Sequence, residues 1–253
     1  MEDSLKYTLI TGASSGIGKA LAYNFASKGH NLIISARRRD LLDAIQKDIK
    51  GKHKVDVIVL EADLLKDSDV TGLYNAGKQY DIDVFINNAG FGDFSYPWDI
   101  DMEKAERMVG LNVNALSKLS LLYVRDYCDK DATLINVSSV GGYYQFTVAV
   151  TYCATKFYVS SLTEGFARAL QAQGKPMRAK VLAPSATSTE FMDRANEDAA
   201  INGNDILTDP SVFISAEQLA EYGYELFKSD KVVGIVNGEN KLELKDPIYP
   251  AVG

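Results

Sequence analysis

The stretch Thr11-Gly12-Ala13-Ser14-Ser15-Gly16-Ile17-Gly18 follows an apolar segment, Tyr7–Thr11, and precedes a segment of helical period. Three glycines at this spacing let the backbone turn sharply between a strand and a helix and approach a pyrophosphate closely. The free N–H groups of the helix start favour its negative charge. A tight turn without a ligand would need one glycine, so the stretch predicts a dinucleotide site. The residues expected to line it are Gly12, Ser14, Ser15, Gly16, Ile17 and Gly18.

Short apolar runs rich in β-branched residues alternate along the chain with longer segments of helical period. The runs are Thr8–Thr11, Leu32–Ser35, Val55–Leu60, Val84–Ile86, Thr133–Val137, Ala179–Ala183 and Val232–Val236. Most are apolar without interruption, as strands buried on both faces of a parallel sheet are. The alternation predicts an α/β fold: a Rossmann-like, doubly wound parallel sheet of about seven strands with helices on both faces.

Composition restricts the classes of function. The chain has 253 residues and a formal net charge of −7, which argues against nucleic-acid and anionic-membrane partners. Two cysteines and two histidines argue against a disulfide framework and a metal site. No apolar run approaches the ~20 residues of a membrane helix, and no signal peptide is visible. We expect one cytoplasmic domain over residues 1–253, with the long loop 186–211 as a substrate lid.

The end of the second predicted strand bears on the choice of dinucleotide. NAD sites place an acidic residue ~20 residues after the glycines, where it holds the ribose 2′-hydroxyl. Here the strand ends in Arg37 and Arg38 instead. A guanidinium can bond a 2′-phosphate at ~1.5–3 kcal/mol per charged hydrogen bond, although the two arginines could also lie at a solvated helix start. We expect NADP(H) to be preferred, with NAD(H) as the alternative.

Tyr152 and Lys156 are four residues apart in a predicted helix, so both project from one face. A free tyrosine has a pKa of ~10, and a neighbouring ammonium lowers it. The pair could then exchange a proton with a carbonyl or alcohol oxygen near neutral pH, although a core tyrosine with a surface lysine shows the same spacing. Ser139 ends the fifth predicted strand, and Asn87–Gly90 follows the fourth. Carboxyl ends of parallel strands share one edge of the sheet, so we expect these groups to converge on the glycine stretch.

Taken together, these motifs resemble those of the short-chain dehydrogenase/reductase family in its compact single-domain form. The resemblance rests on Thr11–Gly18, Asn87–Gly90, Asn112, Ser139 and Tyr152-x-x-x-Lys156. It implies that Tyr152 is the acid/base, that Lys156 lowers its pKa and bonds the nicotinamide ribose, and that Ser139 polarises the substrate oxygen. It further implies that Asn112 interrupts a helix, so that a main-chain carbonyl holds a proton-relay water.

The same resemblance implies further cofactor contacts. Asp63 and Leu64 would flank the adenine, and Asn88, Ala89 and Gly90 would contact the ribose region. Pro184, Thr187 and Thr189 would contact the carboxamide. Ser185 and Thr187 depart from the family's usual Pro-Gly-x-(Val/Ile)-x-Thr pattern, which weakens the expected carboxamide contacts. The family also implies a homodimer or homotetramer, although the Asp-Gly-Gly ending common in tetrameric members does not occur.

The implied activity is hydride transfer between a nicotinamide and a small-molecule carbonyl or secondary alcohol. Aromatic residues near the predicted site suit a bulky apolar ketone, but they could equally form core or a dimer surface: Phe91, Phe94, Trp98, Tyr143, Tyr144 and Phe146. One alternative is a non-catalytic NADP(H)-binding regulatory or scaffold protein, which would not need Ser139, Tyr152 and Lys156 together. A second is an epimerase or dehydratase, which the Gly16-Ile17-Gly18 spacing disfavours.

Overall fold

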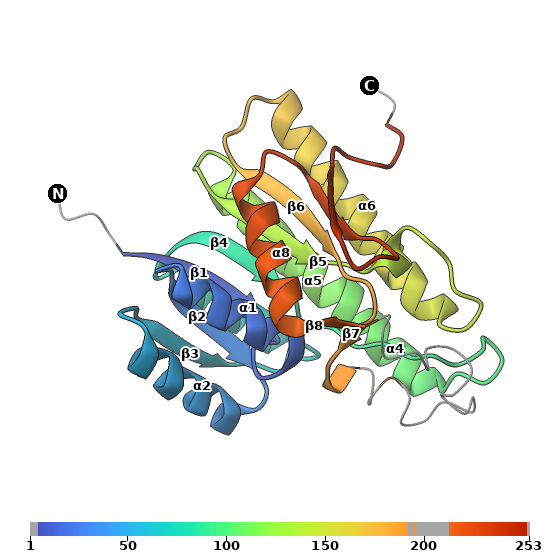
Figure 1. Cartoon of the computed structure of the whole chain (residues 1–253), viewed down its shortest axis with the longest axis horizontal. Helices are drawn as coiled ribbons and strands as arrows, with labels where there is room; N and C mark the ends of the chain where they lie inside the picture. Colours follow the sequence, from blue (N-terminus) through green and yellow to red (C-terminus); the bar gives the residue numbers. More distant parts are fainter. Residues whose placement is uncertain (1–4, 192–194, 196–212, 252–253) are drawn as a thin grey trace.

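The computed structural model describes residues 5–191, 195 and 213–251, and its centre is a sheet of eight strands in the order β10-β9-β6-β5-β4-β1-β2-β3 (Figure 1). The strands are β1 (Lys6–Thr11), β2 (Asn31–Ala36), β3 (Val57–Glu61), β4 (Asp81–Asn87), β5 (Thr133–Val137), β6 (Arg178–Ala183), β9 (Val233–Val236) and β10 (Leu242–Lys245). All pairings are parallel except that of β10 with β9. The chain order reverses between β1 and β4, the position at which doubly wound sheets bind ligands.

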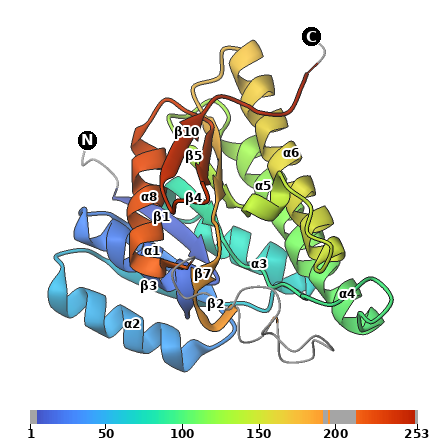
Figure 2. The same cartoon turned by 45° about the vertical axis from the view of Figure 1, so that its right-hand side comes forward.

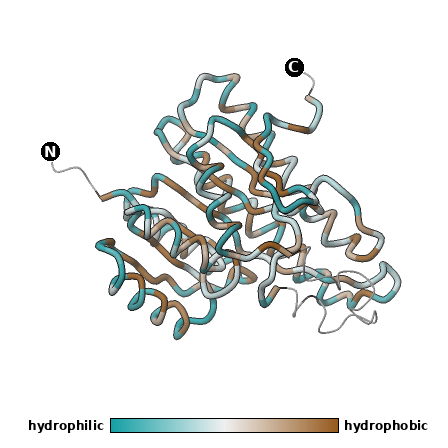
Figure 3. Tube along the Cα trace, in the orientation of Figure 1, coloured by the Kyte–Doolittle hydropathy of each residue, from teal (hydrophilic) through white to brown (hydrophobic). Residues whose placement is uncertain are grey.

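Helices cover both faces of this sheet (Figure 2). Their bounds are α1 (Gly16–Ser27), α2 (Arg39–Lys52), α3 (Asp67–Gly77), α4 (Met102–Val109), α5 (Leu116–Tyr127), α6 (Val150–Ala172) and α8 (Ala216–Lys228). One core cluster joins α1, α2 and α8 to the sheet, and the other joins α3, α5 and α6 to the opposite face. Hydrophobic segments follow the strands between these layers (Figure 3). The fold predicted from the alternation of strands and helices is therefore confirmed.

The eighth strand, β10, is the main element that the sequence did not predict. It forms an antiparallel hairpin with β9, in which Leu242 lies opposite Val236. Its sequence, Leu-Glu-Leu-Lys, alternates apolar and polar residues, because the strand lies at the edge of the sheet and is partly exposed. A search for continuous apolar runs detects strands buried on both faces and misses this one.

A separate two-stranded parallel sheet lies beside the main sheet. It pairs β7 (Thr187–Ser188) with β8 (Ile214–Ser215), and so joins the two sides of the predicted lid. Of that lid, the structure describes 186–191 and Ala195; residues 192–194 and 196–211 lie outside the described residues. The lid therefore stays a prediction.

A π-helical turn, η1 (Gly110–Ala115), separates α4 from α5. Such turns widen an α-helix by one residue and are frequent at functional sites. Over the part of the chain that the structure describes, no helix combines the length and apolar character needed to span a bilayer, and no three His, Cys, Asp or Glu side chains gather as metal ligands. Cys128 and Cys153 are free thiols.

Candidate active site

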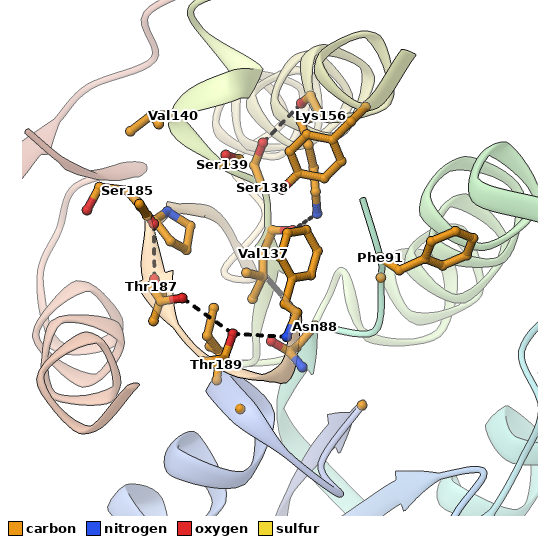
Figure 4. Close-up of a pocket in the computed structure, with 18 of the residues that line it drawn as sticks. Asn88, Phe91, Val137, Ser138, Ser139, Val140, Lys156, Ser185, Thr187 and Thr189 are labelled. Carbon is orange, nitrogen blue, oxygen red and sulfur yellow. Dashed lines mark hydrogen bonds between the residues drawn. The ribbon is translucent and has the colours of Figure 1, made fainter. Parts of the chain in front are cut away.

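A cavity of about 470 Å³ opens at the carboxyl ends of β1, β4, β5 and β6 (Figure 4). Its wall runs from the glycine stretch to the helix that carries the tyrosine and the lysine. Of the predicted site residues, those lining it are Gly12, Ser15, Gly16, Ile17, Gly18, Asn88, Ala89, Gly90, Ser139, Tyr152, Lys156, Pro184, Thr187 and Thr189. The convergence of these segments at one sheet edge, expected from the topology, is thus present in the structure.

The glycine side of the cavity is built from closely packed main chain. Gly12 and Gly16 have φ of +68° and +53°, which side-chain-bearing residues rarely adopt. A Cβ on Gly18 would lie 2.4 Å from the Gly12 carbonyl oxygen and 2.5 Å from Asn88 Nδ2. Asn88 Nδ2 donates to the carbonyl oxygen of Thr11 at 2.9 Å, which ties the turn after β4 to the turn after β1. This turn therefore has the cradle shape that a dinucleotide phosphate requires.

Arg38 lies against the glycine stretch. Its Nη2 donates to Ser15 Oγ at 2.7 Å and to Ser14 Oγ at 3.2 Å, and its Nη1 pairs with Glu190 at 3.1 Å. Arg37, in contrast, is exposed. The guanidinium of Arg38 and the hydroxyls of Ser14 and Ser15 thus form a cluster of donors at the end of β2, where the adenosine ribose of a dinucleotide would lie.

Tyr152, Ser139 and Lys156 line the predicted catalytic side of the cavity. Tyr152 and Lys156 are 7% and 5% exposed, so both titratable groups are buried. The Ser139 hydroxyl lies near enough to Tyr152 to lower the pKa of its phenol, and it accepts from the main-chain N–H of Gly141 at 3.0 Å. Ser138 instead bonds to Ser160 and to the carbonyl oxygen of Lys156 on α6. Ser138 is thus held by α6, and the role expected of Ser139 stays a prediction.

Burial affects the ionisation of Tyr152 and Lys156. Burial raises the pKa of Tyr152 above its usual value, and only the Ser139 hydroxyl opposes this effect. Lys156 lies 5.7 Å from the centre of the tyrosine ring, and its Nζ donates to the carbonyl oxygen of Val137 at 2.9 Å. Burial lowers the pKa of Lys156 to about 8. The lowering of the tyrosine pKa by the lysine, which the sequence leads us to expect, stays a prediction.

Asn112 lies within the π-helical turn and is 1% exposed. Its Nδ2 donates to the carbonyl oxygen of Phe91 at 2.8 Å and to Thr155 Oγ1 at 3.1 Å, and its Oδ1 accepts from the N–H of Phe91. The helix interruption implied by the family resemblance is present. Through these bonds Asn112 joins the loop after β4 to α6, one turn from Tyr152.

Aromatic rings surround the tyrosine on its substrate side. The ring centres of Phe94 and Phe191 lie 6.3 Å and 5.7 Å from that of Tyr152, and Phe91 and Phe146 also line the cavity. Other members of the predicted aromatic set lie elsewhere. Trp98 and Tyr144 are 78% and 63% exposed, and Tyr143 donates to Glu164 on the far side of α6.

Asp63 and Leu64 do not line the cavity. They follow β3, where Asp63 accepts from the N–H of Leu65 and Leu64 packs into the core. The lining residues that sequence reasoning missed include Asn237, Gly238 and Asn240, which belong to the turn between β9 and β10. The Asn237-Gly238 pair after an apolar run is a hairpin signal that could have located this turn.

Comparisons with known proteins agree with the geometry. The family model described as short chain dehydrogenase matches residues 6–200. The NADP-dependent 3-hydroxy acid dehydrogenase of Schizosaccharomyces pombe is 32% identical over 193 residues, which are 74% of this chain and 73% of that protein. A short-chain dehydrogenase from Sphingobium yanoikuyae, solved in complex with NADPH, has a TM-score of 0.80 and 30% identity, covering 91% of this chain and 87% of that one. For the bulky-bulky ketone specific alcohol dehydrogenase from Comamonas testosteroni the TM-score is 0.75 at 26% identity, covering 92% and 86%.

The chain belongs to the short-chain dehydrogenase/reductase family. It is accordingly an oxidoreductase with a Rossmann-like fold and a site for a nicotinamide dinucleotide.

Proposed function

We propose that the protein is an NADP(H)-dependent oxidoreductase that interconverts carbonyl compounds and secondary alcohols, with Tyr152 as the acid/base. The observation that carries this proposal is that one cavity is lined both by the glycine stretch and by Tyr152 and Ser139. A dinucleotide held by the glycine stretch would extend toward Tyr152 and Ser139 along the carboxyl edge of the sheet. That position would bring its reactive end to the two hydroxyls.

The residues on the glycine side fit a dinucleotide. Positive φ at Gly12 and Gly16 and the close approach of Gly18 to Gly12 and Asn88 shape a compact turn that lines the cavity, and the start of α1 offers free N–H groups. Lys156, with a pKa near 8, is charged at neutral pH and can donate to a ribose hydroxyl. When bound, the nicotinamide supplies or accepts the hydride.

The protein's own residues would handle the proton. Tyr152 stays protonated at neutral pH because burial raises its pKa, so its phenol can donate to the oxygen of a carbonyl being reduced. Ser139, which lines the same cavity as Tyr152, would hold that oxygen in place. Asn112 fixes α6 against the loop after β4 and so keeps the tyrosine in position.

The preference for NADP(H) rests on Arg38. Its guanidinium, with Ser14 and Ser15, presents a cluster of donors at the end of β2, where a 2′-phosphate would lie. Glu190 pairs with the same guanidinium and lines the cavity, so a phosphate would compete with this carboxylate. The S. yanoikuyae structure in complex with NADPH supports the preference.

We infer a bulky apolar ketone as the substrate class. Phe91, Phe94, Phe146 and Phe191 form the lining nearest Tyr152, together with Val148. Apolar and aromatic walls favour apolar substituents on both sides of a carbonyl. The name of the C. testosteroni alcohol dehydrogenase, which refers to ketones with two bulky substituents, agrees with this inference.

The test is consumption of NADPH in the presence of a ketone panel. Aryl ketones with two bulky substituents should react at least about tenfold faster, as kcat/KM, than acetone or the charged 2-oxo acid pyruvate. NADPH binding without turnover of any ketone or alcohol would instead support the non-catalytic binding protein.

A further inference from the structure

The segment 246–250, which follows β10, lies across α6 close to the turn that carries Ser139. Tyr249 Oη donates to the carbonyl oxygen of Gly142, the last residue of the short helical turn η2 (Val140–Gly142). The ring of Tyr249 also stacks on that of Tyr143, with centres 5.5 Å apart and planes at 21°. Tyr249 therefore contacts the third and fourth residues after Ser139.

The same segment is anchored to α6. Glu164, which is 1% exposed, accepts from the Tyr249 N–H at 2.9 Å and from Tyr143 Oη at 2.7 Å. Arg168, one turn further along α6, donates to the carbonyl oxygens of Pro247 and Tyr249. Two charged side chains of α6 thus hold the main chain of the segment, and one of them also holds Tyr143.

The turn beneath Tyr249 is packed tightly on the catalytic helix. A Cβ on Gly142 would lie 2.6 Å from Ser160 Oγ and 2.7 Å from the carbonyl oxygen of Lys156. A Cβ on Gly141 would lie 3.3 Å from the sulfur of Cys153, the neighbour of Tyr152. Any displacement of the turn from α6 would therefore change the position of Ser139 relative to Tyr152.

We propose that Tyr249, held by Glu164 and Arg168, is a positioning residue that clamps the Ser139 turn onto α6 and so fixes the serine hydroxyl beside Tyr152. The inference deepens the proposed function, on which its kinetic consequence rests. Tyr249 itself lies outside the residues that line the cavity, so it acts through the turn and does not touch the substrate.

A chemical probe reports on the clamp without any need for turnover. Cys153 is 2% exposed and is covered by Gly141 and Phe146. In a Cys128→Ser background it is the one remaining thiol of the chain. Its rate of reaction with an aromatic disulfide reagent under native conditions measures how often the turn opens.

Tyr249→Phe, which keeps the ring stack and removes the hydroxyl, should raise the Cys153 labelling rate roughly 3- to 10-fold, the range expected for one lost hydrogen bond. Tyr249→Ala should raise it further. The same variants should lower kcat by about tenfold with the Kd for NADPH within about twofold, because the serine moves and the glycine cradle does not.

Tyr23→Phe is the matched control, since its hydroxyl donates to Asp48 between α1 and α2 and touches neither the turn nor α6. The proposal is wrong if the Cys153 labelling rate is unchanged in both Tyr249 variants. It is also wrong if Tyr23→Phe raises that rate as much as the Tyr249 variants do. If the parent protein reduces no ketone, the proposed function is wrong. The Cys153 labelling rates of the Tyr249 variants still test whether Tyr249 holds the Ser139 turn on α6.

Discussion

The two sides of the cavity are lined by different kinds of chemical group. The glycine side consists of main chain: Gly12 and Gly16 with positive φ, the close approach at Gly18, and the Thr11 carbonyl tied to Asn88. The catalytic side consists of buried titratable side chains, Tyr152 and Lys156, whose pKa values depend on burial. The glycines of the first side lie in one short stretch of sequence, which Asn88 closes from a distant loop, whereas the burial of Tyr152 and Lys156 depends on several distant elements. Substitutions should therefore separate cofactor binding from chemistry.

The largest effect is expected at Tyr152. Tyr152→Phe removes the proton donor and leaves the ring, so kcat should fall by about 10²–10⁴. The Kd for NADPH, measured by its fluorescence, should change by less than about twofold, because the glycine cradle is intact. Turnover within tenfold of the parent enzyme would show that another group moves the proton.

At Gly18 we expect a substitution to weaken NADPH binding, the property that Tyr152→Phe should leave nearly unchanged. A Cβ there meets the Gly12 carbonyl oxygen at 2.4 Å, so Gly18→Ala must displace the cradle, and the Kd for NADPH should rise by about 100-fold. Gly72→Ala on α3 is the matched control, since a Cβ at Gly72 meets nothing within 4 Å. It should leave the Kd unchanged and stabilise the protein by ~0.5–1 kcal/mol. Equal Kd values for the two variants would contradict the close-packed cradle.

A smaller effect should distinguish the two arginines after β2. Arg38→Ala should weaken NADPH binding by about tenfold and leave NADH binding nearly unchanged, because only NADPH carries the 2′-phosphate. Arg37→Ala should have less effect, since Arg37 is exposed and Arg38 lies against Ser14 and Ser15. Titration of both dinucleotides against both variants measures this, and a larger loss in the Arg37 variant would reassign the phosphate contact.

The glycine side could be predicted from sequence because its signal is local. Gly12, Gly16 and Gly18 lie within one turn and the start of one helix, and each has a backbone reason to be glycine. The parallel strands were likewise predicted, since burial on both faces produces continuous apolar runs. The convergence of Tyr152 and Ser139 followed from topology, which places carboxyl ends of parallel strands at one edge.

The parts that sequence did not predict depend on contacts between distant segments. The pKa values of Tyr152 and Lys156 depend on burial, to which Phe94 and Phe191 contribute at Tyr152, and no spacing in the sequence encodes that. Nor could spacing show that Asp63 lies beyond the cavity, or that the β9–β10 turn lines it. The contact of Tyr249 with Gly142 spans 107 positions of the chain.

The π-helical turn stores one residue outside the regular helical phase. Each residue advances an α-helix by about 100°, and the wide turn accommodates one extra residue between α4 and α5 without changing which face either helix buries. Loss of a single codon there, such as that of the exposed Asn114, would let the turn close into regular α-helix, so Met108 and Leu116 should keep their buried faces. The wide turn itself also carries Asn112, which bonds to Phe91 and Thr155. Such a deletion should therefore be tolerated by the fold and cost the positioning of Asn112.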